Sequence, residues 1–175
     1  MKSLRNHLLA FVVAIGLVAG GFLSATVAHA DALSNYGENK VMDAILRGQS
    51  LGAPATMYMG LATDTCTDSG AGTEPSGGAY ARVAVTSSLA NWAGTQSAAS
   101  TTASTGTNGT TSNNAVIAWP ASTAAWGNLQ SVRWYDAASA GNSWICINLA
   151  SALNVSGAGF TVQFTAGQLQ FQIDN

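Results

Sequence analysis

Charge is scarce in this chain of 175 residues: only 8% of the residues are charged, with six Lys and Arg against eight Asp and Glu. A protein that binds nucleic acid needs a basic patch, because the release of counterions from the phosphates drives that binding. The sequence offers no such patch. We therefore expect no nucleic-acid partner.

The first 30 residues have the layout of a secretory signal peptide. Lys2 and Arg5 precede an uncharged, mostly apolar stretch, and Ala28-His29-Ala30 provides a small-x-small cleavage site. We expect cleavage before Asp31 and export of the mature chain to the periplasm, the cell surface or the medium. The alternative is an uncleaved membrane anchor, since about 20 apolar residues can span a bilayer. A membrane contact is expected only in that case.

Histidine is absent from the expected mature chain, residues 31–175, because His7 and His29 both lie in the leader. The commonest general base and the commonest metal ligand are therefore missing. Cysteine is limited to Cys66 and Cys146, which in an exported protein are most simply a disulfide, although two free thiols also fit. We expect no enzymatic activity, no cofactor and no bound metal.

A few carboxylates keep two other interpretations open. A glycosidase needs two matched carboxylates, and the credible ones are Asp64, Asp68, Glu74 and Asp136. The first three lie in a Gly-rich loop, 63–79, where a hard cation such as calcium could find oxygen ligands. Their spacing matches no complete calcium loop, so a solvated turn region is favoured.

One helix is expected, over Ser34–Arg47. Ser34 can cap its start and Gly48 can end it. Val41, Ile45 and Leu46 fall at helical spacing and could cover a core.

The rest of the chain favours strands. Seven short segments are rich in β-branched and aromatic residues and are separated by turn-forming residues: 55–63, 80–86, 115–120, 129–137, 143–150, 160–165 and 169–174. The last two alternate apolar and polar residues around an Ala-Gly turn, which predicts a hairpin. The fold class predicted is mainly β, an antiparallel β-sandwich or flattened barrel with one N-terminal helix, in a single domain over residues 31–175.

Residues 93–114 contain only Ala, Gly, Thr, Gln, Ser and Asn. Such a segment cannot bury enough surface to offset its ordering entropy, so we expect a flexible loop or an extended crossover.

Tryptophan is the most informative aromatic residue here. Indoles exposed on a sheet could stack on sugars, which would make the protein a carbohydrate-binding module, whereas buried indoles would belong to the core. The candidates for glycan stacking are Trp92, Trp119, Trp126 and Trp134.

Several strings, in order from Leu33 to Asp174, resemble a family of small tailed-bacteriophage proteins described as tail fibre-like or virion structural proteins. The most specific are E-x-SGG-x-YAR-x-x-V, which begins at Glu74, and WG…YDAASAGN, which begins at Trp126. The resemblance implies an all-β virion component without enzymatic activity, repeated in an assembly. The leader is unexpected in a virion protein, so both export and a virion location stay open.

The first string also suggests a contact. Tyr80 and Arg82 fall on one face of a strand, and Arg82 could pair with Glu74 or Asp136, either to orient a loop or to join subunits. We predict a structural, self-associating protein whose partners are further copies or other virion or filament subunits. The alternative is a secreted module that binds carbohydrate or a host surface.

Overall fold

The structure is a computed structural model that describes residues 21–24, 33–94, 104 and 109–173. Its elements, in chain order, are β1 (Phe22–Ser24), α1 (Asn35–Leu46), β2 (Thr56–Ala62), β3 (Val83–Thr86), β4 (Thr110–Ser112), β5 (Ile117–Ala118), β6 (Gly127–Tyr135), β7 (Ser143–Val155), β8 (Thr161–Phe164) and β9 (Gln170–Gln172). Each of the seven predicted strand segments overlaps one of these strands, although β6 begins two residues before its predicted segment and β7 runs five residues past its own. The predicted helix begins and ends within one residue of α1.

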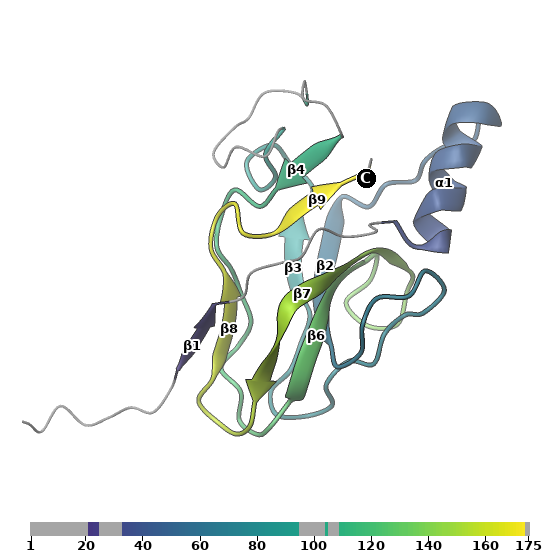
Figure 1. Cartoon of the computed structure of the whole chain (residues 1–175). Helices are drawn as coiled ribbons and strands as arrows, with labels where there is room; N and C mark the ends of the chain where they lie inside the picture. The colour runs from purple at the N-terminus through teal and green to yellow at the C-terminus, as the bar shows by residue number, and fades with distance from the viewer. Residues whose placement is uncertain (1–20, 25–32, 95–103, 105–108, 174–175) are drawn as a thin grey trace, which may run out of the picture.

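The main layer is a four-stranded antiparallel sheet in the order β3-β2-β6-β7 (Figure 1). Met59 of β2 lies opposite Trp134 of β6, and Trp134 lies opposite Ile145 of β7. The side chains of this sheet are buried on both faces along much of β2 and β6. One face therefore meets the core, and the other must be covered by further chain.

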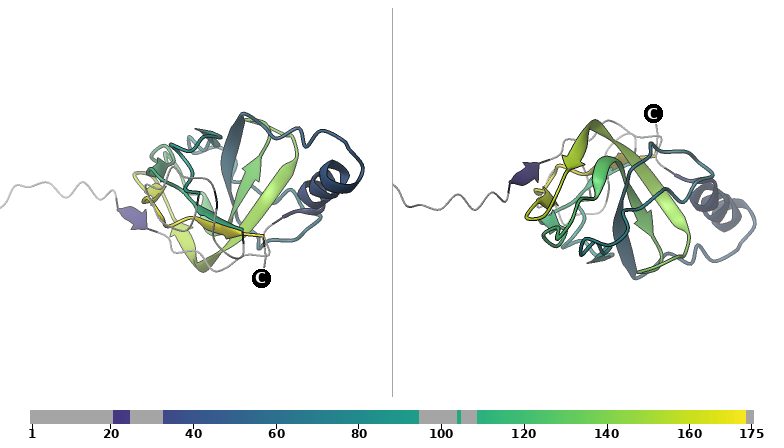
Figure 2. Two further views of the ribbon diagram at one scale, coloured as in Figure 1. Left: turned by 90° about the horizontal axis from the view of Figure 1, so that it is seen from above. Right: turned by 90° about the horizontal axis from the view of Figure 1, so that it is seen from below.

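The second layer consists of two small sheets, β1-β8-β5 and β4-β9. Figure 2 shows this layer beside the main sheet, with α1 outside both. Val162 and Phe164 of β8 and Ile117 of β5 join a buried cluster with Leu129 and Ile147 of the main sheet. The described strands form no closed barrel, and the predicted class, a mainly β sandwich-like fold with one helix, is confirmed. β1 is the exception to the antiparallel pairing, because it runs parallel to β8.

The predicted C-terminal hairpin is wrong, because β8 and β9 lie in different sheets. The buried Asn113 lies between the ends of the two strands. Its amide nitrogen donates to the carbonyl of Thr165 (2.9 Å), its amide oxygen accepts from the Leu169 N–H (2.8 Å), and its carbonyl accepts from the Gly167 N–H (2.7 Å). These bonds use backbone groups that a hairpin would pair with each other, so the strands diverge.

Only the first turn of α1 packs closely on the sheet. Ser34 caps the helix, since its hydroxyl accepts from the Gly37 N–H at 3.2 Å. Gly37 lies against β7: a Cβ added there would approach the Trp144 carbonyl oxygen to 2.7 Å. Ile45 and Leu46 are 71% and 70% exposed. The prediction that they cover the core is therefore wrong, because the helix projects away from the sheet after its first turns (Figure 1).

The end of the predicted flexible loop is a strand: Thr110–Ser112 form β4 and pair with β9. Asn113 also forms a bridge with Trp92. The greater part of that segment, and all of the leader except residues 21–24, lies outside the described residues. Within the described residues no helix is long and apolar enough to cross a membrane.

Candidate functional site

The loop 63–79 covers the outer face of the main sheet and is held there by Arg133 of β6. This guanidinium is 1% exposed. It donates to the carbonyls of Gly70 (2.7 Å) and Thr65 (3.0 Å) and lies 3.6 Å from the Asp64 carboxylate. Its charge is committed to loop carbonyls, so it is not free to bind an anionic ligand.

A disulfide between Cys66 and Cys146 ties the same loop to β7. The Cys66 N–H also donates to the side chain of Asn148 at 2.8 Å. Both cysteines of the chain are in this bond, which leaves no thiol for nucleophilic chemistry.

Glu74, Tyr80 and Arg82 of the E-x-SGG-x-YAR string meet in one cluster. The Glu74 carboxylate accepts from the Tyr80 hydroxyl (2.6 Å) and from two nitrogens of Arg82 (2.6 and 3.0 Å). The remaining terminal nitrogen of Arg82 donates to the carbonyls of Ala137 (2.7 Å) and Ala140 (2.8 Å). Tyr80 and Arg82 lie just before β3 rather than in it, so the predicted strand face is not formed, and the cluster joins the loop to the start of β3 and to the β6–β7 turn of the same chain.

Two phenols complete the cluster in a neutral form. The guanidinium carbon of Arg82 lies 3.4 Å from the centre of the Tyr135 ring. Burial raises the pKa of Tyr135 to about 12, helped by the nearby charge of Glu74. Burial, and then the hydrogen bond to Glu74, raise the pKa of Tyr80 still further. Neither phenol can serve as a base near neutral pH.

Asp136 lies apart from this cluster, so of the two predicted partners Arg82 pairs with Glu74. Asp136 instead accepts from the backbone N–H (2.7 Å) and side chain (2.9 Å) of Asn142 and from the Trp144 indole (3.4 Å). Partial burial alone would raise the pKa of Asp136, but these hydrogen bonds outweigh it and lower the pKa. The carboxylate therefore fixes the β6–β7 turn.

The loop carboxylates do not form a cation site. Asp64 accepts from the N–H and hydroxyl of Thr73, each at 3.1 Å, and Glu74 is bound within the cluster above. In the described part of the chain no group of three or more His, Cys, Asp and Glu side chains is placed to hold a metal.

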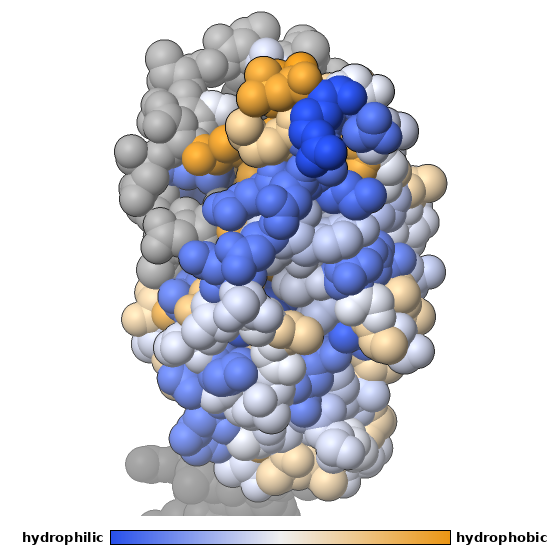
Figure 3. Space-filling view, turned by 90° about the vertical axis from the view of Figure 1, so that its right-hand side faces the viewer, coloured by the Kyte–Doolittle hydropathy of each residue, from blue (hydrophilic) through white to orange (hydrophobic). Residues whose placement is uncertain are grey.

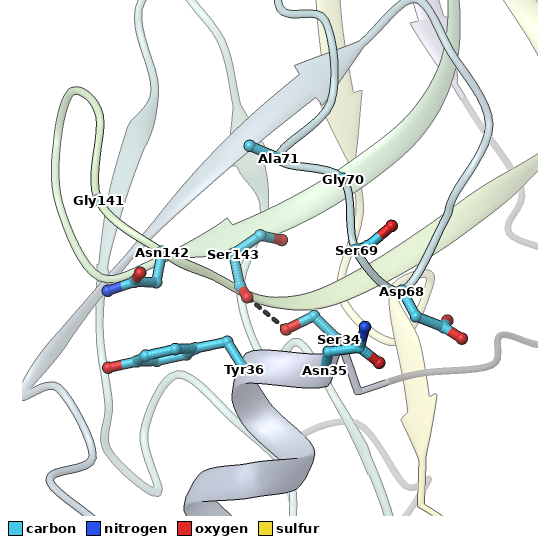
Figure 4. A pocket seen from close by; sticks show the side chains of 10 residues that line it. All are labelled: Ser34, Asn35, Tyr36, Asp68, Ser69, Gly70, Ala71, Gly141, Asn142 and Ser143. Carbon is cyan, nitrogen blue, oxygen red and sulfur yellow. Dashed lines mark hydrogen bonds between the residues drawn. The ribbon is translucent and has the colours of Figure 1, made fainter.

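A polar cavity of about 280 Å³ lies at the start of α1 (Figure 4). The Ser34 hydroxyl donates to the Ser143 carbonyl, and the Asn35 N–H donates to the Asp68 carbonyl at 2.9 Å. The Gly37 and Glu38 amides are bonded to Ser34. These amides at the start of α1 therefore have internal partners and are not open to an anion, and Asp68 is the one carboxylate in the lining of the cavity.

A second cavity, of about 310 Å³, is almost wholly apolar. It lies between α1, β9 and the ends of β2, β6 and β7, and we name it the apolar groove. Its lining comprises Leu33, Val41, Leu51, Ala53, Pro54, Met57, Ser87, Trp92, Thr111, Trp134, Trp144, Ile145 and Phe171.

The projecting end of α1 adds exposed apolar side chains beside the apolar groove. Met42 is half exposed, and Ile45 and Leu46 are largely exposed. The face of the molecule that carries α1 shows an apolar patch at its upper end (Figure 3). We name these three side chains together with the apolar groove the α1 surface. The sequence did not indicate this surface, because the helical spacing of Val41, Ile45 and Leu46 predicted that they cover the core.

The tryptophans do not form a stacking platform for sugars. Trp119, Trp126 and Trp134 are buried in the core cluster, and the Trp126 indole donates to the Gly78 carbonyl at 2.8 Å. Trp92 is half-buried and tilts against Trp134, with 6.1 Å between ring centres. Because three of the four candidates are almost fully buried, the predicted glycan-stacking set is corrected: Trp119, Trp126 and Trp134 are core residues, and Trp92 and Trp134 line the apolar groove.

The comparison with known families gives one match. The sequence model of the family described as "Podophage GP4 fiber I protein gp80" matches residues 32–172. No curated protein matches the chain.

Proposed function

The chain belongs to the Podophage GP4 fiber I protein gp80 family, which makes it a phage virion structural protein. We propose that it is a non-enzymatic fibre subunit that binds further copies of itself through the α1 surface.

The apolar character of the α1 surface carries this proposal. A monomeric soluble protein rarely leaves a contiguous apolar patch open, and such patches mark interaction sites. Here a groove with scarcely any polar lining lies beside a helix end whose largest side chains face solvent. A second copy would cover both and remove Ile45 and Leu46 from water.

The polar clusters support a structural role, because each of them attaches the loop 63–79 to the rest of the same chain. The Glu74–Arg82 pair, the Arg133 contacts and the disulfide each join the loop 63–79 to the sheet of the same chain. Most of their polar groups have partners in the same chain, and the Arg133 Nε, which has none, is buried, so these contacts stabilise the subunit and leave little for substrate chemistry.

The family match begins at residue 32, immediately after the expected cleavage site. This supports processing of the leader before assembly. Intact mass spectrometry of the chain recovered from virions and from the cell envelope tests it: a mass starting at Asp31 in virions is expected, and the full mass in virions would contradict it.

The association itself is tested with the full chain by sedimentation velocity over a concentration series. We expect wild type to associate, and the double variant Ile45→Ser/Leu46→Ser to do so at least about tenfold more weakly. Leu89→Ser is the matched control, since Leu89 is 55% exposed but lies outside the α1 surface. Equal association of the double variant and wild type would refute the α1 surface as the contact.

A further inference from the structure

The outer edge of β8 is occupied by three residues from the leader. Phe22 of β1 lies opposite Thr161, and Ser24 lies opposite Gln163. The Thr161 N–H donates to the Gly21 carbonyl at 3.4 Å. Leu23 is half-buried and packs against the core cluster. The second layer of the sandwich is therefore completed by a segment that lies outside the family match.

The directions of the backbone N–H and C=O groups of β8 determine which of them would lose their partners if β1 were removed. The Trp119 N–H donates to the Val162 carbonyl at 2.9 Å, so the polar groups of Val162 face the β5 side. Because the groups of successive residues alternate along a strand, those of Thr161 and Gln163 face β1. Removal of the leader would leave them as an open edge.

This edge lacks the features that normally prevent strands from pairing between molecules. Native edge strands carry charges, prolines or bulges that discourage such pairing. From Ala137 to Ile173 the chain contains no Asp, Glu, Lys, Arg or Pro. An uncovered β8 would thus present backbone donors and acceptors with no charge or proline in the strand itself or in the chain segments on either side of it.

We propose that the β8 edge is a docking site for the same edge of a second copy, closed by β1 while the leader is in place and opened when the leader is removed. A two-fold contact needs only one self-complementary surface. Two antiparallel copies of Thr161–Phe164 would meet that need and join two second-layer sheets into one. The inference rests on the proposed function in assuming that the leader is removed and that copies associate, and it uses a surface separate from the α1 surface.

A pair of proline variants in the full chain tests the closure by β1. By the same alternation, the Leu23 N–H faces β8 and the Phe22 N–H faces away. Leu23→Pro removes a donor of the β1–β8 pairing, whereas Phe22→Pro, the matched control, is tolerated at an edge strand. By sedimentation velocity we expect Leu23→Pro to associate about tenfold more tightly than wild type, and Phe22→Pro to resemble wild type.

A peptide identifies the edge as the contact. The peptide GGFLSAT, residues 20–26, should refill the edge of Leu23→Pro and reverse the added association. The same peptide with proline in place of leucine should not. Association that the first peptide leaves unchanged would mean that another surface is responsible, and would overturn the proposal.

Amide hydrogen exchange in a dilute sample of Leu23→Pro shows whether the β8 edge has opened while the rest of the fold stays intact. Thr161 and Gln163 should exchange faster than in wild type, whereas Val162, which faces β5, should stay protected. A variant with this pattern that sediments like wild type overturns the proposal. Loss of protection at Val162 also overturns it, because β1 would then be part of the fold rather than a removable cover. Retained association in Ile45→Ser/Leu46→Ser bears on the α1 surface alone, so the two failures are distinguishable.

Discussion

Two neighbouring regions of the molecule, the loop 63–79 and α1, meet their surroundings in opposite ways. The loop 63–79 lies on the strands, with a disulfide and two guanidinium groups bound to partners in the same chain. Beside it, α1 packs through its first turn, where the Asn35 N–H donates to the Asp68 carbonyl, and leaves apolar side chains and a groove open. The first region is held by contacts within one chain, whereas the second exposes apolar side chains that, in the proposed function, a second copy would cover.

This contrast predicts that substitutions beneath the loop act on stability, whereas substitutions on the α1 surface act on association. The following changes test it, from the largest expected effect on the free energy of unfolding to the smallest.

Removal of the disulfide should have the largest effect. The bond closes a segment with a sequence separation of 80 residues, and a loop of that length restricts the unfolded chain by about 4 kcal/mol. We expect Cys66→Ala/Cys146→Ala to lose an amount of that order in urea unfolding, with association of the folded protein unchanged. A loss of association at protein concentrations where the variant is folded would break the contrast.

Glu74→Ala should cost about 3 kcal/mol, because it leaves the nearly buried Arg82 guanidinium without its counter-charge. Glu74→Gln is the control, since it keeps an acceptor for Tyr80 while removing the charge, and should lose less. Thermal unfolding of the two variants separates the contribution of charge from that of shape. Equal losses would show that the charge contributes nothing.

Tyr135→Phe should cost about 1 kcal/mol near neutral pH, because the Ala71 carbonyl loses its hydrogen bond. The pKa of Tyr135 is raised from 10.0 to about 12, so its neutral form is favoured by the fold and its contribution is present below pH 10. It is lost as the pH rises from 10 to 12. The stability of wild type relative to Tyr135→Phe should therefore fall over that range in urea titrations, and a relative stability that rises would contradict the assigned burial.

The sequence predicted the elements well where the signals are local. The alternation of apolar and polar residues in the strands and the cap at Ser34 depend only on residues that are close in sequence, and the structure has strands and a capped helix at those positions. The pairing of Arg82 was predicted only in part, because the sequence left Glu74 and Asp136 open as partners, and the structure pairs Arg82 with Glu74.

The failures involve partners that are distant in sequence. The predicted hairpin between β8 and β9 does not form, because Asn113, about 50 residues away in sequence, makes hydrogen bonds at the ends of both strands. No local sequence pattern indicates these bonds. The spacing of Val41, Ile45 and Leu46 predicted a helix with an apolar side but could not say what would cover it. Likewise, the composition of the leader did not indicate that Phe22–Ser24 pair with β8.

The smallest effect on stability is expected at the free end of α1. Leu46 is 70% exposed, so Leu46→Ser should change the free energy of unfolding of the monomer by less than about 0.5 kcal/mol. At the same time it should weaken association, because a large apolar side chain would no longer be withdrawn from water in the contact. Dilute samples measured by thermal unfolding give the first quantity, and sedimentation gives the second. A clear loss of monomer stability would mean that the end of α1 is held by its own chain, and the distinction between the internally bonded loop 63–79 and the open α1 surface would then fail.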